Sequence, residues 1–111
     1  MAWLLRTGEV LASVELATSR RDRRRGLLGR DGIDGALLIT PARSVHTVGM
    51  RFPIDVAYCR RAGEDLEVID TATMEPWRVG KPRLRARCVI EAERGAFARW
   101  GLTRGDLLQV K

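Results

Sequence analysis

The sequence SVHTVGMRFPIDV occupies residues 44–56 and contains the only histidine of the chain, His46. It also places a carboxylate, Asp55, inside an apolar run, together with a glycine and a proline of the kind that set turns. Apolar and polar residues alternate on both sides of the proline, which predicts two antiparallel strands with His46 opposite Tyr58. Because successive side chains of a strand point to opposite faces, His46 and Asp55 are then predicted not to meet.

Short strands and turns are predicted for most of the remaining chain. Ser19, followed three residues later by Asp22, predicts the start of a helix that ends near Gly29. Residues 95–100 predict one or two helical turns, for which Gly101 supplies a left-handed cap. Strands are predicted at residues 3–7, 10–16, 36–40, 54–60, 66–72, 83–93 and 107–110.

These elements predict a mainly β fold in a single domain, residues 1–111. We expect a compact β-sandwich or barrel, jelly-roll-like, with one N-terminal helix and a short C-terminal helical turn. The composition agrees, because 111 residues with 45% hydrophobic and 31% charged side chains are typical of one small soluble globular domain.

The chain is basic, with 20 Lys and Arg against 14 Asp and Glu and a formal net charge of +6. Such a charge favours contact with anionic surfaces or ligands. Arginines concentrate at residues 20–30 and 78–87. We interpret the first segment as a solvated helix face and the second as the wet face of a half-buried strand. A nucleic-acid partner is therefore an alternative and not the favoured interpretation.

The two cysteines, Cys59 and Cys88, are distant in sequence and form no Cys-x-x-Cys pair. This usage favours a reducing compartment, although a disulfide between them stays open. No secretory leader and no membrane-spanning run are apparent. We expect a cytoplasmic protein without a membrane segment.

The central run also carries a family resemblance. Together with VIE at 89–91, Gly95, RWGL at 99–102 and Gly105–Asp106, it resembles the bacterial and archaeal family called domain of unknown function 192. RGLL at 25–28 extends the resemblance over nearly the whole chain. The resemblance implies a compact, jelly-roll-like β fold and no established activity.

The chain offers few sets of residues for catalysis or metal binding. One histidine and two distant cysteines fall short of the clustered ligands of a zinc site, so no metal and no cofactor are expected. Ser44, His46 and Asp55 can be written as a triad, but the sharp turn that presents a nucleophilic serine is missing. Asp55 also has a structural interpretation, because a carboxylate beside Gly49 and diagonal to Thr47 is expected to accept backbone N–H groups and the Thr47 hydroxyl, which keeps it ionised when partly buried. No catalytic residue is assigned.

The leading interpretation is a non-catalytic β domain that binds a small ligand or a protein partner in a cleft near residues 46–55. Two alternatives remain: a hydrolase-type enzyme that uses His46 with Asp55 or Glu91, and an RNA-binding accessory protein that uses its arginine-rich faces. The oligomeric state is not indicated. The candidate ligand-binding residues are His46, Thr47, Met50, Asp55, Trp77 and Glu91.

Overall fold

The chain opens with a β-hairpin, as the sequence predicts. In the computed structural model, which describes residues 2–111, β1 (Ala2–Arg6) and β2 (Glu9–Ala17) pair antiparallel with Trp3 opposite Ser13. The turn between them uses positive φ angles at Thr7 and Gly8, a conformation that glycine adopts without steric cost.

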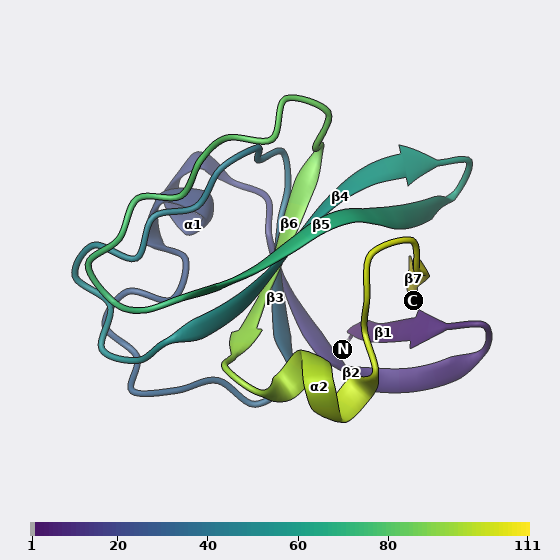
Figure 1. Ribbon diagram of the computed structural model, residues 1–111, viewed down its shortest axis with the longest axis horizontal. Coiled ribbons are helices and arrows are strands. Elements are labelled where there is room, and N and C mark those ends of the chain that lie inside the picture. Colours follow the sequence, from purple (N-terminus) through teal and green to yellow (C-terminus); the bar gives the residue numbers. More distant parts are fainter. Residues whose placement is uncertain (1) are drawn as a thin grey trace.

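Seven strands close into a barrel in the order β1-β2-β3-β6-β4-β5-β7 (Figure 1). The later strands are β3 (Ala36–Ile39), β4 (Ile54–Ala62), β5 (Asp65–Met74), β6 (Cys88–Glu93) and β7 (Leu107–Val110). β7 closes the barrel by pairing with both β1 and β5. The barrel part of the prediction is confirmed. A sandwich and a jelly roll are not confirmed, because one sheet closes on itself and β2 runs parallel to β3.

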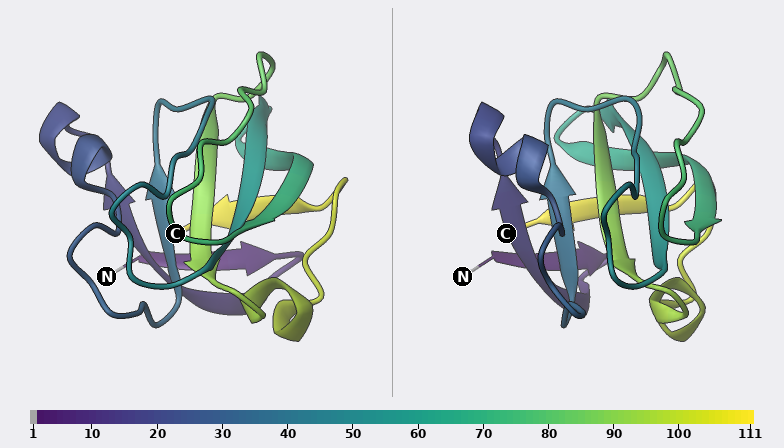
Figure 2. Two further views of the ribbon diagram at one scale, coloured as in Figure 1. Left: turned by 60° about the vertical axis from the view of Figure 1, so that its left-hand side comes forward. Right: turned by 90° about the vertical axis from the view of Figure 1, so that its left-hand side faces the viewer.

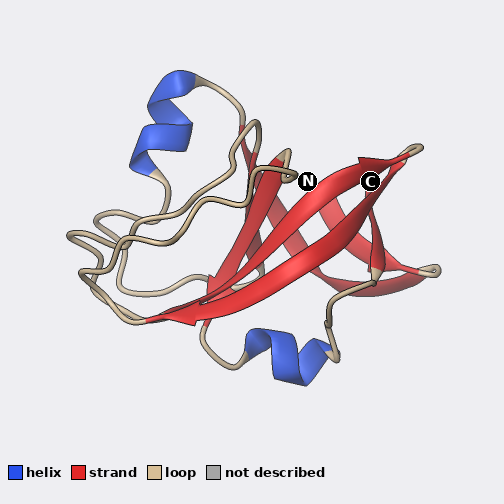
Figure 3. Ribbon diagram, turned by 45° about the horizontal axis from the view of Figure 1, so that its top comes forward, coloured by secondary structure: helices blue, strands red, loops and turns tan. Residues whose placement is uncertain are grey.

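Two short helices lie outside the barrel (Figure 3). The helix α1 (Arg20–Arg25) follows the opening hairpin, and the Ser19 side chain caps it by accepting the N–H of Asp22 at 3.0 Å. The predicted end near Gly29 is wrong, because Gly26 takes up a positive φ and ends the helix after six residues. The helix α2 (Ala96–Trp100) ends at Gly101 in the left-handed conformation, as predicted.

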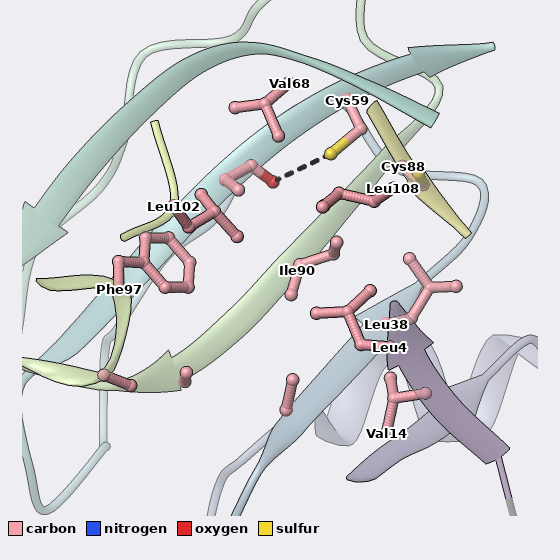
Figure 4. Packing of buried hydrophobic residues seen from close by; sticks show 14 residues of the cluster. Leu4, Val14, Leu38, Cys59, Val68, Cys88, Ile90, Phe97, Leu102 and Leu108 are labelled. Atoms are coloured by element: carbon pink, nitrogen blue, oxygen red, sulfur yellow. Dashed lines mark hydrogen bonds between the residues drawn. The ribbon is translucent and has the colours of Figure 1, made fainter. Parts of the chain in front are cut away.

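The barrel interior holds one apolar cluster, to which nearly every element contributes (Figure 4). A second cluster covers the outer face of β3, β4 and β6, where loop side chains such as Leu27, Val45 and Phe52 pack against Ile54 and Val56. The first six residues of β4 and the first five of β6 are consequently buried on both faces. Along β6, Cys88, Ile90 and Ala92 face the interior, so the parity of the strand turns Glu91 to the outer face.

The predicted strand ahead of Pro53 does not form. Both edges of β4 are occupied, by β5 on one side and β6 on the other, so no edge remains for residues 46–50. Tyr58 therefore lies opposite Val89 and Asp70 and not opposite His46. Residues 41–53 instead run beside the loop 75–87 (Figure 2), where an isolated bridge joins His46 to Val79.

The predicted strand 83–93 is also too long at its start. Residues 83–87 form a turn in which the N–H of Ala86 donates to the Arg83 carbonyl, and β6 begins only at Cys88. The N–H of Ala42 in turn donates to the Arg87 carbonyl at 3.0 Å. The arginines of this segment therefore lie on a loop and not on the face of a strand.

Candidate functional site

Thr47 fixes the two neighbouring loops to one another. Its side chain is fully buried, and its Oγ1 donates to the Glu75 carbonyl at 2.6 Å and accepts the N–H of Arg78 at 2.9 Å. Its backbone carbonyl accepts the N–H of Trp77 at 2.9 Å. The hydroxyl thus donates one hydrogen bond and accepts another within the chain, so this predicted site residue holds the two loops together.

Asp55 caps the start of α2. Its Oδ2 accepts the N–H groups of Gly95 and Phe97 at 3.0 and 3.1 Å, and its Oδ1 accepts the Thr73 hydroxyl at 3.0 Å. These bonds satisfy N–H donors that have no partner within the helix. Asp55 thus accepts N–H groups and a hydroxyl, as its structural interpretation predicts, but the predicted hydroxyl partner is wrong, because Thr73 and not Thr47 donates to it.

His46, Met50 and Glu91 line one pocket of about 130 Å³ between α1 and the outer face of β6. Ser44 lines it as well, and the end of α1 with the residues that follow forms its cover. The carboxylate of Glu91 lies next to this cover, because its Oε1 is 3.9 Å from the place where a Cβ on Gly26 would lie. The structure thus brings three of the six predicted site residues together.

The Glu91 carboxyl group is the most unusual group in this pocket. The residue is only 4% exposed, and no side chain or backbone group of residues 2–111 donates a hydrogen bond to it within normal distance. Burial raises its pKa to about 7, because desolvation disfavours the charged form. A buried acid of this kind is either a cost to the fold or a group that awaits a partner.

The rim of the pocket is basic. Arg23, Arg24 and Arg25 line it, and the Arg23 guanidinium donates to the Pro41 carbonyl at 3.1 Å, which ties α1 to the loop behind the pocket. The sequence predicts that these arginines lie on a solvated helix face, and it does not predict that they lie near Glu91. The run RGLL at 25–28, part of the family resemblance, is the sequence signal that points to this cover.

Trp77 does not line this pocket. Its side chain is 67% exposed, and its backbone has a positive φ of 64°, which is uncommon for a residue other than glycine. Asp55 likewise borders a different hollow, near α2. The predicted set of six residues therefore separates into three places in the fold.

The two cysteines lie opposite each other on neighbouring strands, a juxtaposition that the sequence did not predict. Cys59 on β4 pairs with Cys88 on β6, both side chains are buried, and both are free thiols. The neighbouring Cys88 thiol, followed by burial, raises the pKa of Cys59. Within residues 2–111, no three His, Cys, Asp or Glu side chains gather as metal ligands would, and no helix is both long and apolar enough to cross a bilayer.

The chain is similar in sequence to proteins for which no activity is established. The family model DUF192, described as "Uncharacterized ACR", matches residues 3–110. The protein PH1112 of Pyrococcus horikoshii, named UPF0127, is 32% identical over 87 residues, 74% of this chain and 73% of that protein. The UPF0127 protein PF1050 of Pyrococcus furiosus is 33% identical over 66 residues, 60% of this chain and only 54% of its own length.

Two solved structures share the fold. A protein of unknown function from Novosphingobium aromaticivorans superimposes with a TM-score of 0.77 at 18% identity and covers 97% of this chain and 82% of its own. A Sinorhizobium meliloti protein, designated a candidate transcription regulator, gives a TM-score of 0.70 at 18% identity over 98% of this chain and 91% of its own. At such identities the likeness concerns the fold alone.

Proposed function

We propose that this chain, which belongs to the DUF192 family of uncharacterised proteins, is a non-catalytic β domain that binds a small ligand in the pocket between α1 and β6. The observation that carries the proposal is the buried Glu91 carboxyl group, which lines the pocket without a hydrogen-bond donor from residues 2–111. A ligand that donates hydrogen bonds to Glu91 would replace the hydration that the carboxylate loses on folding.

The chemistry of the pocket favours a small zwitterion. A protonated amine would pair with the Glu91 carboxylate at the floor, and the guanidinium groups of Arg24 and Arg25 at the rim would attract an anionic group. A volume of about 130 Å³ is small. Since a water molecule takes about 30 Å³ in the liquid, the pocket accommodates a ligand of a few non-hydrogen atoms, or the head group of a larger one.

Amide chemical-shift titration of the labelled protein tests this proposal. The probes are glycine, β-alanine and ethanolamine, each added at pH 8, where Glu91 is ionised. We expect saturable shifts confined to residues 26–28 and 44–46, with an affinity that falls as the pH drops below about 7 and Glu91 takes up a proton.

Two glutamate variants serve as the matched pair. Glu91→Gln removes the charge at nearly constant volume and should abolish the shifts. Glu64→Gln makes the same chemical change at an exposed position in the turn after β4 and should leave them intact. Equal binding by both variants, or no saturable shift with any probe, would contradict a ligand site at Glu91.

One observation supports the alternative that the chain is a hydrolase. His46 and Glu91 line the same pocket as Ser44, whereas Asp55 is occupied at α2. Of the two acids first considered, only Glu91 therefore remains available to His46. Hydrolysis of a small activated ester that His46→Asn removes, while binding of the amines persists, would place this alternative ahead of a pure binding function.

A further inference from the structure

A second concave surface lies apart from the Glu91 pocket, at the loop 83–87. Two adjoining hollows of about 570 and 590 Å³ share Arg60, Leu84 and Arg85 and extend from the end of β4 to the turn before β7. We call this surface the arginine groove. The arginines that line it are Arg60, Arg61, Arg83, Arg85, Arg87 and Arg104.

The acidic residues of the groove are already paired. Glu67 forms an ion pair with Arg60, and Asp70 forms one with Arg83 at 2.9 Å. These are the two acids that line the hollows. The remaining four arginines, Arg61, Arg85, Arg87 and Arg104, form no ion pair within residues 2–111, and all four are exposed.

Four unpaired guanidinium groups around one groove repel one another and are available to an external anion. The planar guanidinium matches two phosphate oxygens at once. A single small anion would engage one or two of these groups, whereas a chain of phosphates could engage all of them. We propose that the arginine groove binds single-stranded nucleic acid through its phosphate backbone.

The residues that line the groove favour a single strand over the other polyanions. A flexible single strand can bring successive phosphates to arginines on β4, on the loop 83–87 and on the turn at residue 104, whereas a duplex holds its phosphates at a fixed spacing. Stable membrane attachment needs buried apolar area in addition to basic charge. Leu84 is exposed, but it is the one large apolar side chain that both hollows share, so the groove offers little apolar surface to a membrane. No aromatic side chain lines the groove within residues 2–111, because Tyr58 lies beneath the Arg83 guanidinium at 4.1 Å.

Without an aromatic platform the bases cannot stack on the protein, so binding should depend on charge and not on sequence. Four phosphate contacts predict that the logarithm of affinity falls with the logarithm of salt concentration with a slope of about −3, or roughly 50-fold between 50 and 200 mM salt. RNA and DNA strands should bind within a few-fold of each other, because their phosphates are alike.

Fluorescence anisotropy with labelled rU20 and dT20 over this salt range tests the proposal. The groove variant R61Q/R85Q/R87Q should lose at least tenfold in affinity at 50 mM salt, and the slope should fall in magnitude by about 2. The control variant R20Q/R21Q/R99Q removes the same net charge from exposed positions outside the groove. Its affinity should fall by no more than about threefold, because only the long-range electrostatic attraction to the strand is weakened. Circular dichroism and thermal melts confirm that both variants fold.

Three results would overturn the proposal. Equal losses in the two triple variants would assign the binding to net charge alone. Tenfold tighter binding of a 20-base-pair duplex, or of polyglutamate, would assign the groove to another partner. Stronger partition of the protein to vesicles with 30% anionic lipid than to either strand at the same salt would assign it to membranes.

Discussion

Replacement of Glu91 by glutamine should stabilise the protein at alkaline pH and leave it nearly unchanged at acid pH. Burial raises the pKa of the Glu91 carboxyl group from 4.5 to about 7. At ~1.4 kcal/mol for each pKa unit, ionisation of the buried group therefore costs the folded state roughly 3 kcal/mol. Because the side chain is only 4% exposed, solvent screening reduces this cost very little.

The direction of the pH dependence follows from whether the folded or the unfolded chain binds more protons. Below pH 4.5 the carboxyl group is protonated in both the folded and the unfolded chain, so it adds no pH dependence. Between pH 4.5 and about 7 the unfolded chain releases the proton while the folded chain keeps it. Since the folded state then binds more protons, the free energy of unfolding falls as the pH rises, and it levels off above about pH 7.

Urea denaturation of both proteins at intervals from pH 4 to pH 8.5 measures the effect. The free energies of unfolding should differ little at pH 4, and the difference should grow to roughly 3 kcal/mol in favour of Glu91→Gln at pH 8. Glu64→Gln, at an exposed turn, should follow the wild type throughout. If the curves of wild type and Glu91→Gln run parallel, the carboxylate is not destabilised by burial and has a partner in the folded chain.

Two further substitutions test the neighbouring structure. Asp55→Asn should cost roughly 1–3 kcal/mol in urea denaturation, because the amide cannot accept both N–H groups at the start of α2 as a charged acceptor; a change within 0.5 kcal/mol would contradict the capping role. Tyr58→Phe should be neutral or stabilise by up to about 1 kcal/mol, because the Tyr58 hydroxyl is buried without a hydrogen-bond partner among residues 2–111. A loss of about 2 kcal/mol or more on that change would show that the hydroxyl is satisfied after all.

Local signals in the sequence were sufficient for the features that depend on a few neighbouring residues. The Ser19 cap needs only Asp22, three residues on, and the left-handed Gly101 follows directly on α2. The opening hairpin needs only its own alternation and a turn with Gly8. These were predicted because their hydrogen bonds close within a few residues.

The errors concern pairing over long distances. The segment 44–50 alternates like a strand, but both edges of β4 are taken by partners that come later in the chain, β5 and β6. The segment pairs instead with a loop about 30 residues away, through contacts such as Thr47 N–H to the Arg78 carbonyl at 2.8 Å. Alternation alone cannot distinguish an edge that is free from one that is occupied. For the same reason the sequence pattern does not predict that the end of α1 lies next to Glu91, because that contact also joins segments far apart in the chain.

The two buried acids of the barrel, Asp55 and Glu91, differ in how their carboxyl groups are satisfied. Asp55 and Glu91 are about equally buried, but Asp55 accepts three hydrogen bonds while Glu91 accepts none from residues 2–111. A domain of this size has a total stability of about 5–15 kcal/mol, so an unpaired carboxylate that costs roughly 3 kcal/mol consumes a large part of it. An apolar residue at position 91 would pack against Leu27 and Ile39 on the same outer face without this cost. A hydrogen-bond donor from outside the chain would remove this cost, and under our proposal that donor enters through the pocket that Glu91 lines.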